Sequence, residues 1–172
     1  AQDSAIWGAV AAGQRMSEPL TITVHGHRPA PQGSKRHIGN GRLIEQSKRV
    51  KPWRAAAADA IRAAIGPGWV PLDGPLAVEV VFTVRKPKSA PKTRTTWPCT
   101  RDSGDLDKLL RSTFDALADD SRAIADDSRV IRVTATKVFP GEHPEALDAP
   151  GAVIRVWQLT YTAQVTNTKE AS

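Results

Sequence analysis

Two pairs of aspartates in the second half of the sequence have the residue type and the spacing for metal-dependent chemistry. Asp105 and Asp107 stand one residue apart at the start of a predicted helix. Asp126 and Asp127 are adjacent, just before a predicted strand. Mg²⁺ prefers a few carboxylate oxygens combined with water and phosphate oxygens, and it can activate water for attack on a phosphodiester. The sequence therefore predicts that the two pairs converge on Mg²⁺ at a surface that holds a phosphate backbone.

A purely structural role would also explain the first pair. Asp105 occupies a position expected for a helix N-cap, and an acid in the first turn complements the helix dipole. The spacing of Asp107, Arg111 and Asp115 instead forms a charged stripe opposite the leucines of the helix. Two carboxylates about 4 Å apart repel each other by roughly 4 kcal/mol at an effective dielectric near 20. Either the aspartates do not converge, or a cation holds them together.

The charge of the chain indicates a polyanionic partner. The net charge is +6 and the isoelectric point is near 9.8, although a basic protein without such a partner could have the same values. Basic residues cluster at 35–54 and at 85–101, as expected for segments that neutralise phosphates. The basic residues that we expect to contact nucleic acid are Lys35, Arg36, Arg42, Lys48, Arg49, Lys86, Lys88, Lys92, Arg94 and Arg101, together with Lys108 on the helix.

Hydrophobic patterns predict the elements that must position these residues. Strands are expected at 20–26, 76–85, 129–139 and 152–162, a short hairpin at 37–46, and helices at 52–65 and 105–117. The basic, proline-rich segment 86–104 is expected to be a loop. Several strands and two main helices, without regular alternation of strand and helix, predict an α+β domain with a mixed β-sheet.

Length and composition indicate one globular domain. The chain has 172 residues, 40% hydrophobic and 24% charged, with no apolar run long enough to cross a membrane. The lone Cys99 excludes an internal disulfide and a cysteine-rich zinc site, which fits a reducing, cytoplasmic setting. We expect residues 16–164 to form the domain, 1–15 to be a tag remnant, a leader or an N-terminal arm, and 165–172 to be a flexible tail.

The run DLDKLLRSTFDAL, followed by IADDSRV, resembles the RusA family of Holliday junction resolvases. Upstream, ITVHGHRPAPQGSKR is similar to the family's opening strand and basic loop, so the resemblance covers roughly residues 19–139. It implies a RusA-like fold and a homodimeric, Mg²⁺-dependent endonuclease of a bacterium, phage or prophage. Such an enzyme resolves four-way DNA junctions by paired symmetric nicks in recombination and repair.

The resemblance also assigns roles to individual residues. Asp105 and Asp107 carry over as metal ligands, and Asp127, with Asp126 as its neighbour, best matches the family's third essential aspartate. The family's essential lysine falls on Arg111, which can stabilise charge on a phosphate but is a poor proton donor. Lys108 is a possible substitute for that lysine.

The sequence ADDSR occurs twice, at 118–122 and at 125–129. By the resemblance, the first copy lies at the C-terminus of the helix and in the following turn, where acids oppose the helix dipole but are common in solvent. The second copy faces the metal. We therefore predict that only the second aspartate pair is catalytic.

The partners follow from the same reasoning. A four-way junction has two-fold symmetry and one chain carries one acidic constellation, so we expect a C2 homodimer on branched DNA. Trp97 either stacks on an unpaired base at the junction or packs in the core. We expect Mg²⁺, with Mn²⁺ as a substitute, and neither a small-molecule cofactor nor a membrane. The alternatives are a branched-DNA-binding protein that does not cut, and a less specific metal-dependent nuclease.

Overall fold

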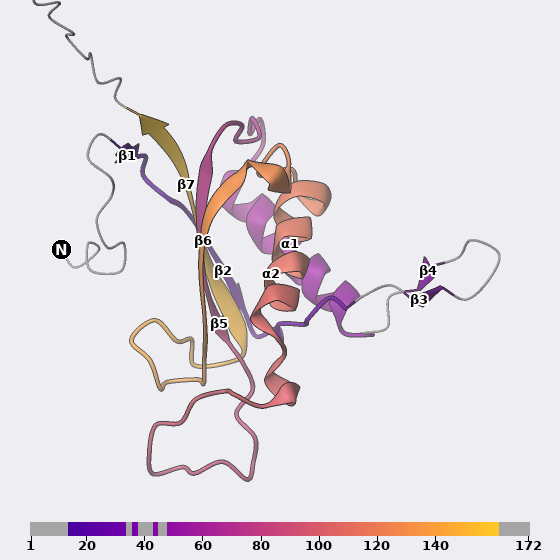
Figure 1. Cartoon of the computed structure of the whole chain (residues 1–172), viewed down its shortest axis with the longest axis vertical. Helices are drawn as coiled ribbons and strands as arrows, with labels where there is room; N and C mark the ends of the chain where they lie inside the picture. Colours follow the sequence, from indigo (N-terminus) through magenta and orange to yellow (C-terminus); the bar gives the residue numbers. More distant parts are fainter. Residues whose placement is uncertain (1–13, 34–35, 38–42, 45–47, 162–172) are drawn as a thin grey trace, which may run out of the picture.

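The computed structural model describes residues 14–33, 36–37, 43–44 and 48–161 (Figure 1). The strands are β1 (Gln14–Met16), β2 (Leu20–His25), β3 (Arg36–His37), β4 (Leu43–Ile44), β5 (Leu76–Thr83), β6 (Val130–Val138) and β7 (Gly151–Tyr161). The helices are α1 (Val50–Ile65), α2 (Leu106–Asp115), the 3₁₀ turns η1 (Arg101–Ser103) and η3 (Asp127–Arg129), and the π-helical turn η2 (Ala116–Asp120). None of these helices is long and apolar enough to span a membrane.

The main sheet is mixed and has five strands in the order β1-β7-β5-β6, with β2 also on β7. β1 and β2 pair with successive stretches of the same edge of β7, and both are antiparallel to it. β5 is antiparallel to β7 but parallel to β6. In the described part of the chain β6 therefore has a partner strand on one side only, which makes it an edge strand.

Both main helices cover the same face of this sheet (Figure 1). Trp53 and Ile61 of α1 and Leu109 of α2 are buried in the same hydrophobic core as Val78 and Phe82 of β5. Alternate residues of β5 point to the helices because successive side chains of a strand point to opposite faces. The result is a two-layer α+β domain, and the predicted fold class is confirmed.

Strand β5, helix α2 and strand β6 form a β-α-β unit, since β5 and β6 are parallel and α2 connects them. In such a unit the helix runs antiparallel to both strands. The N-terminus of α2 therefore lies beside the C-terminal end of β6, and the chain crosses the length of the sheet before β6 begins (Figure 1). The sequence pattern predicts no regular alternation of strand and helix, so this local topology differs from the expectation.

The structure describes parts of two segments outside the main expected strands, the N-terminal segment 1–15 and the hairpin at 37–46. Gln14 and Arg15 fall in the segment expected to lie outside the fold, yet they pair with Tyr161 and Thr160 of β7. The expected hairpin at 37–46 is present as the β3–β4 pair, in which Arg36 lies opposite Ile44. Residues between these two strands, most of 1–15 and the tail 165–172 lie outside the described residues.

Candidate functional site

Asp105 lies directly before α2, but its side chain does not cap the helix. Its backbone carbonyl accepts the first helical hydrogen bond, from the Leu109 N–H at 3.0 Å. The Oδ2 atom instead lies 2.7 Å from Lys108 Nζ. The hydrogen bond from Lys108 lowers the pKa of Asp105, and the charges of Lys108 and Lys137 act in the same direction. The capping explanation of this aspartate is therefore wrong for its side chain, which remains on the surface as a charged group.

The turn before Asp105 is tightly held. Gly104 has φ 82° and ψ 157°, a conformation that is essentially restricted to glycine, and an added Cβ would lie 3.1 Å from Pro31 Cγ. Ser103 Oγ lies 2.7 Å from the Pro98 carbonyl oxygen. Lys137 Nζ, from the end of β6, donates to the Gly104 carbonyl at 2.7 Å and to Ser103 Oγ at 2.9 Å. These contacts fix the point from which α2 starts.

Asp107 and Arg111 lie one helical turn apart on α2, and both are exposed. Their exposure leaves a carboxylate and a guanidinium facing solvent beside Asp105, where a phosphate could reach them. Lys108 is also exposed, and its hydrogen bond to Asp105 raises its pKa. The Lys108 ammonium therefore lies beside the Asp105 carboxylate.

The basic loop between β5 and α2 lies at the same end of the molecule as the start of α2 (Figure 1), which Asp105 directly precedes. Its exposed basic residues are Arg85, Lys88, Lys92, Arg94 and Arg101. Trp97 is 63% exposed, so the core alternative for this side chain is wrong. Lys86 is half-buried and forms an ion pair with Glu142, which also accepts a hydrogen bond from the Thr96 N–H at 3.0 Å. Lys86 therefore anchors the loop, and its charge is partly neutralised.

The first basic cluster is only partly described. Lys35 and Arg42 lie outside the described residues, and Arg36 is described as part of strand β3. Lys48 and Arg49 are exposed immediately before α1. The structure thus leaves the DNA contacts predicted for this cluster as predictions.

Asp126 and Asp127 lie just before the start of β6. The other end of this strand is the one that contacts Gly104 through Lys137. Asp126 caps the 3₁₀ turn η3, where its Oδ1 accepts a hydrogen bond from the Ser128 N–H at 2.8 Å. Hydrogen bonds from Ser128 lower the pKa of Asp126. Asp127 is exposed, and the next-but-one residue, Arg129, forms an ion pair of 2.5 Å with Asp73. This second pair therefore presents Asp127 to solvent while Asp126 holds the turn.

The two aspartate pairs do not converge within one chain, which corrects the expectation from the sequence. Asp105 adjoins Gly104, which contacts Lys137 at the end of β6, whereas Asp127 precedes the first residue of that strand. The nine residues of β6 span roughly 30 Å at ~3.3 Å per residue. Among the described residues no three acidic, histidine or cysteine side chains are grouped closely enough to hold a metal ion. One chain therefore places the two aspartate pairs at opposite ends of β6.

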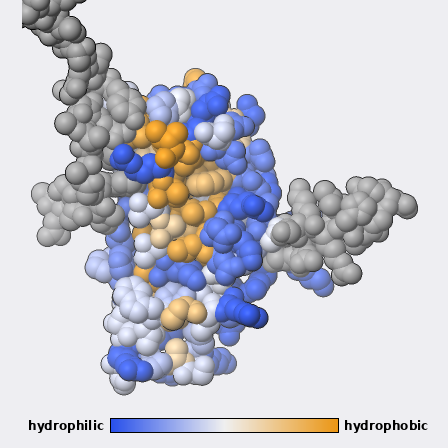
Figure 2. All heavy atoms as spheres, viewed as in Figure 1, coloured by the Kyte–Doolittle hydropathy of each residue, from blue (hydrophilic) through white to orange (hydrophobic). Residues whose placement is uncertain are grey.

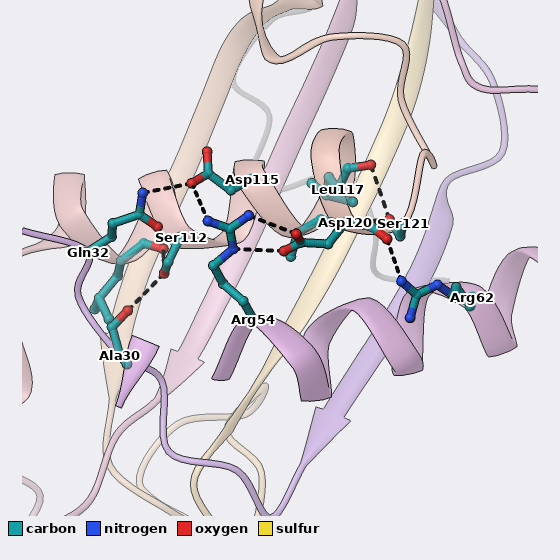
Figure 3. Close-up of polar contacts among 11 residues, drawn as sticks. Ala30, Gln32, Arg54, Arg62, Ser112, Asp115, Leu117, Asp120 and Ser121 are labelled. Carbon is teal, nitrogen blue, oxygen red and sulfur yellow. Dashed lines mark hydrogen bonds and ion pairs between the residues drawn. The ribbon is translucent and has the colours of Figure 1, made fainter. Parts of the chain in front are cut away.

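The first ADDSR copy has a structural contact that the sequence did not predict (Figure 3). Asp119 is exposed, but both carboxylate oxygens of Asp120 accept hydrogen bonds from the Arg54 guanidinium, at 2.7 and 2.8 Å. Arg54 also contacts Asp115 at 3.0 Å, and Asp115 accepts a second hydrogen bond from Gln32 at 2.7 Å. This network ties α1 to α2 and η2, so Asp115 and Arg54 stabilise the fold.

Two residues near Asp105 were not proposed from the sequence. Arg28 forms an ion pair of 2.9 Å with Asp102 and lowers the pKa of that aspartate. Lys137 reaches the turn at Gly104 from a distant strand. Arg28 lies in the RPAPQGSKR loop, whose richness in donors was a usable signal. Lys137 stands in a strand pattern with no local feature that distinguishes it from a surface lysine.

Comparison with known proteins identifies the family of the chain. The family model described as Endodeoxyribonuclease RusA matches residues 11–147, which include both aspartate pairs, the basic loop and Lys137. No curated protein matches the chain significantly. Because the match covers most of the chain, this protein belongs to the RusA family of endodeoxyribonucleases.

Proposed function

We propose that the protein is a Mg²⁺-dependent endonuclease that resolves four-way DNA junctions by paired symmetric nicks, in recombination and repair in the bacterial cytoplasm. The observation that carries this proposal is the position of two surface carboxylates, Asp105 and Asp107, beside an exposed basic loop in a RusA-family chain. A positive surface attracts the phosphate backbone, and carboxylates within it suit a divalent cation.

The residues at the start of α2 fit half of a Mg²⁺ site. Asp105 is not used for capping and Asp107 is exposed, so their oxygens suit a hard cation that keeps several water ligands. When bound, Mg²⁺ or Mn²⁺ would activate water and offset the negative charge that develops on the phosphate. Arg111, one turn further along α2, is placed to hold a phosphate oxygen and to stabilise the same charge.

The other half of the site would come from a second copy of the chain. Asp127 lies roughly 30 Å from the start of α2 along β6, too far to share a cation within one chain. If two β6 edges lie antiparallel across a two-fold axis, the beginning of one strand comes beside the end of the other. Asp127 of the partner subunit then approaches Asp105 and Asp107, and a C2 dimer contains two complete sites.

The surface of β6 supports this dimer. Ile131 is 59% exposed and Val133 is 44% exposed, and both lie on the strand that has an open edge. Hydrophobic side chains gather over this strand on the face that Figure 2 shows. A register centred on Arg132 would place Ile131 opposite Val133 of the partner subunit. The same register would place Lys137 opposite Asp127 of the partner subunit, which is the placement that the composite site needs.

The direct test is cleavage of a synthetic four-way junction compared with linear duplex of the same sequence. We expect Mg²⁺ to support paired nicks in opposing strands of the junction and little cutting of the duplex. Tight junction binding without nicking at any Mg²⁺ or Mn²⁺ concentration would favour a branched-DNA-binding protein. Equal cutting of both substrates would favour a less specific nuclease.

The basic loop makes a second, quantitative prediction about binding. Replacing Lys88, Lys92, Arg94 or Arg101 with alanine should weaken junction binding and flatten its salt dependence by about 0.9 in log–log slope for each phosphate that is no longer neutralised. Lys86→Ala should change the slope less, because Glu142 already neutralises that charge. Fluorescence anisotropy over a range of salt concentrations measures both. An affinity that does not depend on salt would contradict the predicted phosphate contacts.

A further inference from the structure

Lys137 is a half-buried cation whose contacts lie at the candidate site and not on the strand that carries it. It stands near the end of β6, opposite Phe82 of β5, on the face of the sheet that the helices cover. Its Nζ donates to the Gly104 carbonyl at 2.7 Å and to Ser103 Oγ at 2.9 Å. The first of these acceptors belongs to the residue that directly precedes Asp105.

The two acceptors belong to a turn with little freedom of its own to move. Ser103 is 7% exposed, and its Oγ lies 2.6 Å from the Thr100 carbonyl oxygen as well as near that of Pro98. Gly104 is buried, and an added Cβ would be in tight contact with the ring of Pro31, at 3.1 Å from its Cγ. The ammonium group of Lys137 therefore joins β6 to both the basic loop and the start of α2.

We propose that Lys137 is a positioning residue that fixes the turn at Ser103 and Gly104 and so holds the Asp105 carboxylate in the orientation needed for a divalent cation. This role rests on the proposed function and adds a residue to it. Lys137 acts through the backbone of Gly104. Because a displacement of about 1 Å in a catalytic group can cost up to a hundredfold in rate, removal of the Lys137 ammonium is expected to be visible in kcat.

The alternative role for Lys137 is a purely electrostatic one, and the two roles differ in sign. A lysine that acted by charge alone would repel the cation, so its removal would strengthen cation binding. A lysine that positions Asp105 would do the opposite, since a mobile carboxylate binds the cation less well. Mn²⁺ affinity, measured by electron paramagnetic resonance, therefore separates the two roles without any DNA.

The test compares Lys137→Met with Lys137→Arg, which keeps the charge and the donors, and with Thr136→Val on the other face of β6. Amide hydrogen exchange at Ser103 and Gly104, whose N–H groups are bonded to Thr100 and Arg101 at 3.1 Å, should accelerate at least about tenfold in Lys137→Met. Exchange at these positions should stay unchanged in Thr136→Val. Mn²⁺ binding by Lys137→Met should weaken, and kcat for junction nicking should fall roughly ten- to hundredfold. Lys137→Arg should recover most of each loss.

The outcomes separate this proposal from the proposed function. Unchanged exchange in Lys137→Met, or faster exchange with unchanged Mn²⁺ affinity, would overturn the positioning role. Stronger Mn²⁺ binding would overturn it in favour of the electrostatic role. If the unaltered protein does not nick junctions, the proposed function fails, while exchange and Mn²⁺ affinity still decide what Lys137 does.

Discussion

Asp127→Asn is expected to reduce junction nicking by at least about a hundredfold while junction binding stays intact or becomes tighter. The substitution removes one cation ligand and, at the same time, a negative charge that repels the phosphate backbone. Asp127 is exposed and Asp126 holds the turn, so the fold should tolerate the change. Nicking under single-turnover conditions and a binding titration in Ca²⁺ measure the two effects separately.

The first ADDSR copy provides matched controls with the same chemical change. Asp119→Asn alters an exposed side chain and should affect neither nicking nor stability. Asp120→Asn should also leave nicking nearly unchanged, but it weakens the ion pair with Arg54 (Figure 3). Loss of that charged hydrogen bond should lower the free energy of unfolding by roughly 1–3 kcal/mol, visible as a lower Tm. Equal losses of nicking from Asp120→Asn and Asp127→Asn would show that the two copies were assigned to the wrong roles.

The sequence predicted the elements of this fold well, because each has a local signature. The nearly continuous apolar run of β5, which is buried throughout, and the leucine spacing of α2 are properties of neighbouring residues. The surface position of Asp105 and Asp107 at the start of α2 also followed from the local pattern. Strand β1 was missed because a three-residue strand on the edge of β7 has too few residues for a periodic pattern.

The convergence of the aspartates could not be predicted from their spacing along the chain. Asp107 and Asp126 are close in sequence, but their spacing does not state the direction in which the intervening helix runs. The strand–helix–strand order contained the needed information, because a helix that links parallel strands must run antiparallel to them. That direction places the start of α2 and the start of β6 at opposite ends of the sheet.

Contacts between residues far apart in the sequence are the other part of the structure that the sequence did not predict. Lys137 approaches Gly104 because β6 pairs in parallel with β5 and ends beside the turn. Arg54 meets Asp120 because α1 packs against η2. Neither contact leaves a signal in the residues next to it, so a basic residue that binds DNA and one that holds the fold look alike in sequence. Arg54 is an example, because it stands within the basic cluster at 35–54 and yet holds the fold.

The composite site predicts that two inactive variants restore each other. In a dimer of one Asp107→Asn chain and one Asp127→Asn chain, one site carries both substitutions and the other carries neither. Heterodimers purified with two different tags should therefore nick a junction at about half the wild-type rate per dimer, in one strand only. The matched control is a heterodimer of Asp105→Asn and Asp107→Asn, in which each site keeps one substitution and stays inactive.

This complementation measurement tests the central claim most directly, because it depends on which chain supplies each aspartate. The account predicts single-strand nicking by the Asp107→Asn and Asp127→Asn heterodimer and none by either homodimer. If each chain formed a whole site alone, every site in that heterodimer would carry one substitution. An inactive heterodimer, with the wild-type dimer active under the same conditions, would contradict the composite site.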